Sequence, residues 1–215
     1  AEKIQEEFRP LMLTYTDIGG RFTGGYVEGS PLQWRWAVPH DPDGLISLFK
    51  SRTYFVEQLE EFFSKSLPHV GRLPNAYYWH GNQPDLFAAY LFNSAGRPDL
   101  TAKWVRWILE NKYSTAENGL DGNDDGGTLS AWYVLSSLGI YPVDGTDEYE
   151  LTSPLWDRAE LDFGGNRLVI RSQKAMDDSL YPKRILLNGV EHSGSRIRHE
   201  QLVEGRELVF ELGGQ

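Results

Sequence analysis

The feature that most constrains the fold is a change of hydrophobic pattern near Pro142. Before this residue, apolar side chains recur at the three- and four-residue spacing of helices. After it, short apolar or alternating runs stand between glycine-containing turns, a pattern typical of strands. Helices followed by strands predict an α+β protein. The 215 residues suffice for one large domain or two small ones, with a real core.

The expected helices are joined by loops that carry most of the polar and acidic residues. Asp41-Pro42-Asp43 is expected to cap one helix, Thr128 is the expected N-cap of the last, and Gly139 is expected to end it. The aromatic residues within these helices are expected to lie in the core. The predicted helices span residues 1–13, 44–49, 53–66, 86–95, 100–112 and 129–138.

The second part of the chain is expected to form an antiparallel sheet, because its apolar runs are separated by Gly-Gly-Asn, Asn-Gly and Glu-Gly turns. We place the domain border so that residues 1–143 form a helical domain and residues 144–215 a strand domain. The predicted strands span residues 161–163, 167–170, 184–187 and 207–212.

The composition excludes several classes of function. A net charge of −10 argues against nucleic acid or an anionic membrane as partner, since either requires a basic patch. The absence of Cys excludes disulfides and thiolate metal sites. Aromatic residues make up 13% of the chain, enough to fill a core or to line a groove that stacks on sugar rings. No apolar run is long enough to span a membrane.

Ala1 to Glu7 are charged and helix-like, so a signal peptide is not expected among these residues. A chain that begins within such a segment is expected to be a mature or excised portion of something larger.

The densest group of polar residues is the segment Gly122-Asn123-Asp124-Asp125-Gly126-Gly127, which precedes the last predicted helix. We call residues 122–128 the acidic turn. Carboxylates beside a helix N-terminus are favoured by the helix dipole, so both can stay ionised. A solvated acidic loop is the plainer interpretation of an isolated Asp-Asp pair.

A second polar group surrounds Glu28, which is flanked in sequence by Tyr26, Trp34 and Trp36. Apolar surroundings raise the pKa of a carboxyl group, as a general acid requires. The alternative is an exposed glutamate, or one paired with Arg35; from the sequence both remain open.

A third loop contains Trp79, His80, Asn82 and Gln83. Amide oxygens are ligands for hard cations such as calcium, although an ordinary turn explains a single Asn-Gln pair as well. His80 either binds a ligand or satisfies a polar group in the core. With no second histidine at metal spacing, zinc is improbable.

These three loops, in this order and spacing, resemble the calcium-dependent exo-α-mannosidases of glycoside hydrolase family 92. The matching segments continue through Gly139-Ile140-Tyr141-Pro142-Val143, Ser153-Pro154-Leu155-Trp156 and Leu187-Asn188-Gly189, so that the resemblance covers essentially the whole chain. It implies that residues 1–143 are the C-terminal half of an (α/α)6 catalytic barrel. It also implies that residues 144–215 belong to a β-sandwich. The remaining partners would be an N-terminal domain and the first half of the barrel, absent from this chain.

The resemblance also implies the chemistry. Terminal α-linked mannose would be removed from a glycan with inversion, with Glu28 as general acid and Asp125 as general base, beside Asn123. Inversion requires the two carboxyl groups to lie roughly 6.5–9.5 Å apart. Trp34, Trp79, His80 and Asp124 would contact the substrate. Ca²⁺ would lie near Asn82, Gln83 and Asp125, and the location would be extracellular or periplasmic.

The chain departs from the family pattern at two positions: Gln83 stands where many members have Glu, and Phe87 stands where a His often follows. The alternatives to a mannosidase are a non-catalytic carbohydrate-binding or structural fragment, and another (α/α)6 glycosidase or sugar phosphorylase. An enzyme would hydrolyse mannosides, a binding module would bind mannose without hydrolysis, and a phosphorylase would depend on phosphate.

Overall fold

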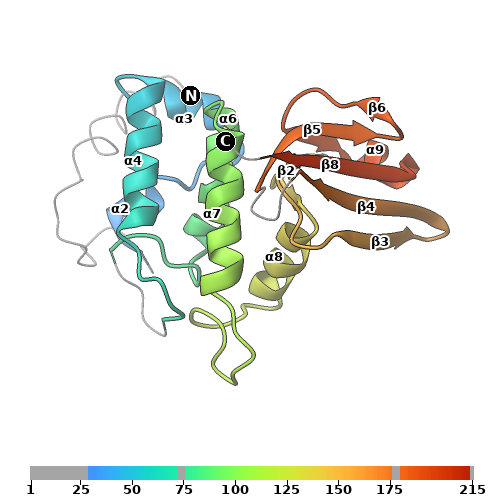
Figure 1. Ribbon diagram of the computed structural model, residues 1–215. Helices are drawn as coiled ribbons and strands as arrows, with labels where there is room; N and C mark the ends of the chain where they lie inside the picture. The colour runs from blue at the N-terminus through green and yellow to red at the C-terminus, as the bar shows by residue number, and fades with distance from the viewer. Residues whose placement is uncertain (1–28, 72–75, 176–179, 214–215) are drawn as a thin grey trace. The chain divides into compact units, whose positions relative to one another are not determined.

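A computed structural model describes residues 29–71, 76–175 and 180–213 (Figure 1). By contacts the chain divides into two compact units. The first takes the residues up to Ala95 together with Glu110–Leu129, and the second takes Gly96–Leu109 and the residues from Ser130 onward. The second unit includes helical stretches that precede residue 143, so this division differs from the predicted domain border, which stays a prediction. The predicted helix over residues 1–13 lies outside the described residues.

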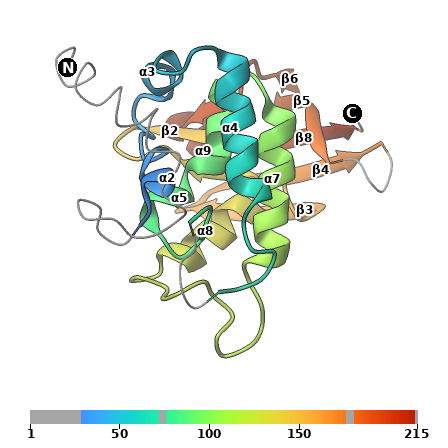
Figure 2. The same cartoon turned by 90° about the vertical axis from the view of Figure 1, so that its left-hand side faces the viewer.

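The first unit is helical. Asp41 caps helix α3 by accepting a hydrogen bond from the Gly44 N–H, as predicted, and α4 buries the aromatic face predicted for residues 53–66. Helix α2, which the periodicity did not predict, begins with the Ser30 capping box and lies beside α5 (Figure 2). The helices are α2 (Pro31–Trp34), α3 (Pro42–Ser47), α4 (Arg52–Ser64), α5 (Gln83–Leu86), η2 (Ala88–Tyr90) and α6 (Leu91–Ser94).

The predicted continuous helix over residues 86–95 is wrong. The chain forms three short pieces instead, α5, the 3₁₀ turn η2 and α6, and it starts at Gln83 because Pro84 suits the first helical turn. Every residue from 84 to 93 is buried. A segment buried on all sides follows the packing around it, and this one has no amphipathic face to keep it regular.

The core of the first unit is largely aromatic. Trp36 stacks on Phe49 at 5.7 Å between ring centroids, and Phe63 packs on Tyr78 at 4.6 Å. Such pairs stabilise by about 0.5–1.5 kcal/mol beyond the area they bury. Tyr78 therefore fixes the start of the loop that carries Trp79 to Gln83 against α4.

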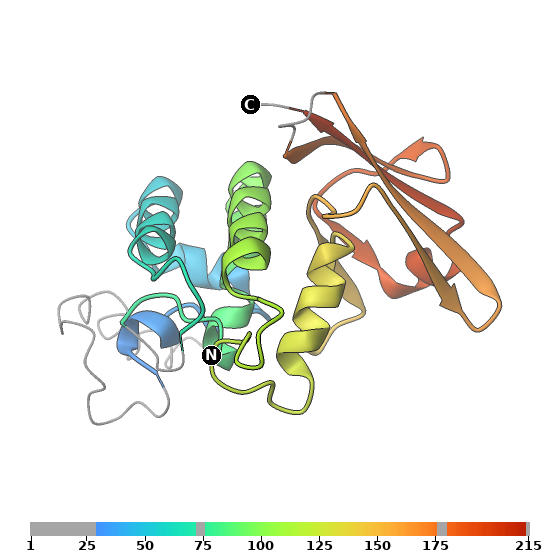
Figure 3. The same ribbon diagram turned by 60° about the horizontal axis from the view of Figure 1, so that its bottom comes forward.

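The second unit contains the strands, which form two sheets in the orders β1-β2-β7 and β3-β4-β8-β5-β6. Figure 3 shows the twist of the larger sheet. Leu138 and residues of both sheets and of α9 share one apolar core. The elements are α7 (Pro98–Asn111), α8 (Thr128–Ser137), β1 (Ile140–Pro142), β2 (Glu148–Leu151), β3 (Arg158–Phe163), β4 (Asn166–Lys174), β5 (Tyr181–Leu187), β6 (Val190–Glu191), β7 (Arg196–Arg198), α9 (His199–Glu204) and β8 (Glu207–Gly213).

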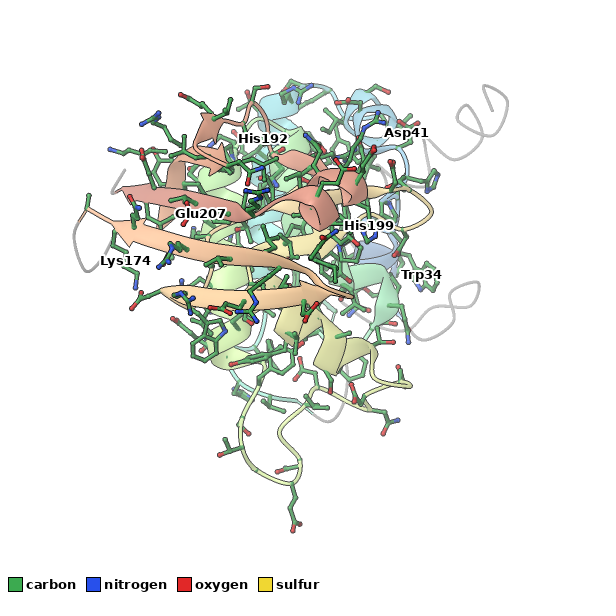
Figure 4. The ribbon with its side chains drawn as sticks, turned by 90° about the vertical axis from the view of Figure 1, so that its right-hand side faces the viewer. Trp34, Asp41, Lys174, His192, His199 and Glu207 are labelled. Atoms are coloured by element: carbon green, nitrogen blue, oxygen red, sulfur yellow. The ribbon has the colours of Figure 1, made fainter. Side chains whose placement is uncertain are left out.

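The structure confirms the α+β class, but the prediction of a purely antiparallel sheet is wrong. Strand β8 runs antiparallel to β5 and parallel to β4, with Ile170 opposite Leu208. A strand inserted between two strands of opposite direction must be parallel to one of them. On the outer face, Glu207 of β8 pairs with Arg171 of β4, and Lys174 ends β4 (Figure 4).

Candidate active site

The acidic turn is built from backbone that glycine favours. Gly122, Gly126 and Gly127 have φ values of +68°, +70° and +95°, and Asp125 adopts φ +49°. Asp and Asn tolerate this left-handed region better than most residues, at a cost of about 1 kcal/mol or more. Thr128 is the first residue of α8 and not its N-cap, because its hydroxyl donates to the carbonyl oxygen of Asp125 at 2.8 Å. The turn thus places a strained aspartate three residues before the first residue of α8.

The structure brings Gln83 and Asp125 together. The Gln83 Nε2 donates to Asp125 Oδ2 at 2.7 Å, across 42 residues of sequence, and both side chains are exposed. Hydrogen bonds to a carboxylate are shorter and stronger than bonds between neutral groups. This contact links the first turn of α5 to the acidic turn.

Asp121, the residue directly before the acidic turn, also holds this turn in place. The Oδ1 of this buried carboxylate accepts from the Gly71 N–H at 2.5 Å, and its Oδ2 accepts from the His80 N–H at 3.1 Å. Lys112 Nζ lies 3.3 Å from the same Oδ2 and donates to the His69 carbonyl at 2.9 Å. Burial raises the pKa of Asp121 and lowers the pKa of Lys112.

His80 lies in the interior of the first unit. Its ring nitrogens are hydrogen-bonded to two tyrosine hydroxyls, Nδ1 to Tyr78 at 2.5 Å and Nε2 to Tyr113 at 2.6 Å. Burial lowers the pKa of His80 to about 3, so the imidazole is neutral. This arrangement matches the core role that the sequence left open, and substrate binding by His80 stays a prediction.

Trp79 packs between two glycines. A Cβ placed on Gly122 would lie 2.9 Å from Trp79 Cη2, and one placed on Gly81 would lie 2.7 Å from Trp79 Cζ2. The indole Nε1 donates to the Gly71 carbonyl at 2.9 Å. Glycine is needed at both positions because the ring and the backbone approach so closely. The ring therefore lies between the acidic turn and the loop that contains Gln83.

Glu28 lies outside the described residues, and its separation from Asp125 stays a prediction. The next residue, Gly29, is buried, and a Cβ placed there would lie 2.8 Å from both Asn82 Nδ2 and Trp34 Nε1. Trp34 is 40% exposed and lies at the surface (Figure 4). The segment that follows Glu28 therefore packs directly on the amide of Asn82.

Asp85 is a buried carboxyl group that the sequence did not single out. Its Oδ2 accepts from the Trp79 N–H at 2.9 Å, while its Oδ1 has no hydrogen-bond partner among the described residues. Burial raises the pKa of Asp85 well above its usual range. The Asp85 carboxyl group holds the backbone of the Trp79 loop through this hydrogen bond and is buried from solvent.

A pocket of about 430 Å³ adjoins the acidic turn. Asn123 and Asp124 line it, together with Glu117 and Asn118 of the preceding loop. Asp125 is directed to Gln83 instead. The pocket lining therefore contains two of the predicted site residues and excludes Asp125 and Gln83. Its remaining lining residues are Val70, Leu120 and Gly122.

Within the described ranges no three His, Cys, Asp or Glu side chains are grouped as a metal site would require. Calcium also accepts amide oxygens, and the side chains of Gln83 and Asp125, which meet here, carry an amide and a carboxylate oxygen, with the amide of Asn82 adjacent in sequence. Gln83 contacts Asp125 through its amide nitrogen, so this hydrogen bond uses neither the Gln83 amide oxygen nor Oδ1 of Asp125. The residues present therefore fit a hard cation.

The structure thus brings two predicted site residues, Gln83 and Asp125, into direct contact. Asn123 and Asp124 line the adjoining pocket instead. Sequence reasoning missed Asp121, Lys112 and Asp85. A signal for Asp121 existed, since a charged residue directly before a glycine-framed turn is a candidate for anchoring it. Lys112 and Asp85 gave none, because their partners lie in other segments.

The described part of the chain contains no helix that is both long and apolar enough to cross a membrane.

Comparison with known proteins identifies relatives. Residues 4–214 match the family model described as the glycosyl hydrolase family 92 catalytic domain. The chain is similar to an "Uncharacterized secreted glycosidase" of Arthroderma benhamiae, with 28% identity over 180 residues, 82% of this chain and 22% of that protein.

Two solved structures from Bacteroides thetaiotaomicron are also similar. One is a family GH92 α-mannosidase in complex with mannoimidazole, with a TM-score of 0.80 and 29% identity, covering 94% of this chain and 28% of that one. The other is a family GH92 inverting mannosidase, with a TM-score of 0.77 and 30% identity, covering 90% and 28%. The chain spans only 22% to 28% of the length of these three relatives. It belongs to glycosyl hydrolase family 92, as part of the catalytic domain.

Proposed function

We propose that this chain carries the base-bearing part of an inverting exo-α-mannosidase. The observation that carries the proposal is the position of Asp125, which Gln83 holds in a strained turn three residues before the first residue of α8. The amide donates to the carboxylate and so fixes its position. A positioned carboxylate can accept a proton from an attacking water molecule. The mannosidases to which the chain is similar support the choice of substrate.

In this mechanism Glu28 donates a proton to the departing glycosidic oxygen while Asp125 accepts one from the attacking water. Asn123 and Asp124 face the adjoining pocket, where they can accept or donate hydrogen bonds to sugar hydroxyls. Exposed Trp34 offers a flat apolar face for a sugar ring, and Trp79 positions the acidic turn.

Asn82, Gln83 and Asp125 would hold Ca²⁺, which when bound fixes vicinal hydroxyls of the substrate. An extracellular or periplasmic location accompanies a role in glycan processing and is supported by the secreted relative.

The test uses the intact protein that contains these residues, with Asp125→Asn and Glu28→Gln. Asp125→Asn should reduce kcat by about 10²–10⁴-fold on all mannosides, because the base is lost. Glu28→Gln should spare substrates with good leaving groups, because these leave without protonation. Proton NMR should detect β-mannose as the first product. Release of α-mannose first, or an equal loss in Glu28→Gln on both substrate types, contradicts the mechanism.

A matched variant separates the base from its neighbour. Asp124→Asn changes the adjacent carboxylate, which lines the pocket, and should raise KM more than it lowers kcat. Binding of mannose by a folded protein that hydrolyses no mannoside would instead favour the binding-module alternative.

A further inference from the structure

We propose that Asp121 is a positioning residue: its buried carboxylate, paired with Lys112, fixes the acidic turn against the Trp79–Gln83 loop. The inference rests on the proposed function only for its effect on turnover. The structural part concerns contacts among described residues and can be tested without activity.

Several segments of the chain meet at the Asp121 carboxylate. Asp121 accepts from the backbone of Gly71 and of His80, which lie in two different stretches of the chain. Its charge partner Lys112 follows the end of α7 and binds the His69 carbonyl. A single side chain thus joins residues 69–71, residue 80, residue 112 and the acidic turn.

Two hydrogen bonds connect the Trp79–Gln83 loop to the acidic turn and to Asp121, which precedes it. Asp121 binds the His80 N–H at one point, and Asp125 binds the Gln83 amide at the other. The two hydrogen bonds are three residues apart along the loop, at His80 and Gln83, and four apart at Asp121 and Asp125. Between them the backbones are in close contact, since a Cβ on Gly81 would lie 2.4 Å from the Asp121 carbonyl oxygen. Two hydrogen bonds fix the register between the two segments, whereas one would allow them to shift relative to each other.

The Asp121–Lys112 pair is buried: Lys112 is 1% exposed and Asp121 0%. His80, beneath them, is neutral and adds no charge, and its ring joins the Tyr78 and Tyr113 hydroxyls. Tyr113 in turn donates to the Leu129 carbonyl, in the first turn of α8. The polar network therefore reaches both ends of the acidic turn.

The Asp121–Lys112 pair is expected to contribute little to the free energy of folding. Taking two charges out of water costs about as much as their attraction returns, so a buried ion pair is a poor source of stability. An apolar pair of similar volume would hold the fold as well. Geometric specificity remains as the role of this pair, since the carboxylate accepts from two backbone N–H groups at defined positions.

The experiment compares Asp121→Asn, Lys112→Met and the double variant in the intact protein. Glu150→Gln is the matched control, because Glu150 is also 0% exposed and paired, with Arg196, but lies in the sheet unit. The readouts are hydrogen exchange in residues 76–83 and 121–127, the unfolding midpoint, and kcat and KM separately. The double variant keeps the test decisive if a lone buried charge prevents folding in a single variant.

We expect the double variant to recover most of the stability lost in the single variants, because no unpaired charge remains. It should still show faster exchange in both segments and a kcat at least about tenfold lower with little change in KM, since small misplacements reduce turnover strongly. Glu150→Gln should leave exchange in both segments and kcat unchanged. Wild-type exchange and wild-type kcat in the double variant would overturn the proposal.

An equal effect of Glu150→Gln on kcat and on both segments would also overturn it, as a sign of general destabilisation. Faster exchange in a protein that hydrolyses no mannoside would uphold the positioning role and refute the proposed function. The two failures are therefore distinguishable.

Discussion

The side-chain amide of Gln83 donates to the carboxylate of Asp125 at 2.7 Å. In the family that the sequence resembles, many members carry Glu at the position of Gln83. A neutral donor at this position supports a neighbouring carboxylate, whereas a second carboxylate requires a cation between the two. The chain therefore holds its proposed base partly by a hydrogen bond.

We predict that Gln83→Glu makes activity more dependent on Ca²⁺. Two unit charges at this distance repel by roughly 1.5 kcal/mol in bulk water, and by more near a protein surface. The activity of the variant should fall about tenfold after chelation and return as Ca²⁺ is added, whereas the wild type should respond less. The measurement is kcat/KM against free Ca²⁺ concentration. Gln83→Ala, which removes the donor without adding charge, is the control, and identical calcium curves for Glu and Gln would refute the idea.

A second prediction concerns the packing of Trp79 on the acidic turn. Gly122→Ala adds a Cβ that would lie 2.9 Å from Trp79 Cη2, at φ +68°. Gly126→Ala is a matched control, because φ is +70° there and no atom of the described residues lies within 4 Å of the added Cβ. Both variants carry the conformational cost of about 1–2 kcal/mol, but only the first displaces the ring.

Thermal unfolding should therefore show a larger loss of stability for Gly122→Ala than for Gly126→Ala. The quenching pattern of Trp fluorescence should change only in Gly122→Ala. Equal losses in the two variants would mean that the ring adapts without cost.

A third prediction uses the buried imidazole. The pKa of His80 is lowered by burial to about 3, against about 6.5 in an unfolded chain. Between these values the unfolded state binds more protons, so the stabilisation is complete above about pH 6.5 and is lost as pH falls toward 3. The slope from this group is roughly 1 kcal/mol per pH unit.

Urea unfolding from pH 7 to pH 4 should show a stability that falls more steeply with falling pH in the wild type than in His80→Gln, and the difference in slope is the contribution of His80. His199→Gln, in which the replaced side chain is exposed, should keep the wild-type slope. A parallel pH profile for His80→Gln and the wild type would show that another group controls acid unfolding.

The sequence allowed prediction of those parts of the fold that depend on local pattern. The cap at Asp41 and the apolar face of α4 follow from residues a few positions apart. The parallel pairing of β4 and β8 could not be predicted, because it depends on where a strand inserts after about 30 intervening residues.

The site divides in the same way. The motifs placed Asn82, Gln83 and Asp125 in one predicted site, and the structure joins two of them directly. Lys112 carries no local mark of burial, since a lysine near the end of a helix is usually exposed. Its pairing with Asp121 becomes visible only when the loops are folded together.

The last prediction concerns Asp85, whose Oδ2 accepts from the Trp79 N–H and whose Oδ1 lacks a hydrogen-bond partner in the part of the chain that the structure describes. Burial raises the pKa of this carboxyl well above its usual range. A raised folded-state pKa stabilises the protein below the unfolded value near pH 4, and that stabilisation is lost as pH rises toward the folded value. Asn at this position keeps an acceptor for the Trp79 N–H and has no charge to bury.

Asp85→Asn should therefore raise the free energy of unfolding at pH 8 by about 1 kcal/mol, and the gain should vanish near pH 4. Asp121→Asn is the informative contrast, because Asp121 is equally buried but accepts two backbone N–H groups and faces Lys112. That variant should lose stability at pH 8, because Lys112 is left without its charge partner. Thermal unfolding of both variants at pH 4, 6 and 8 measures the difference, and a lower midpoint for Asp85→Asn at pH 8 would show that the carboxylate is held by contacts beyond the Trp79 N–H.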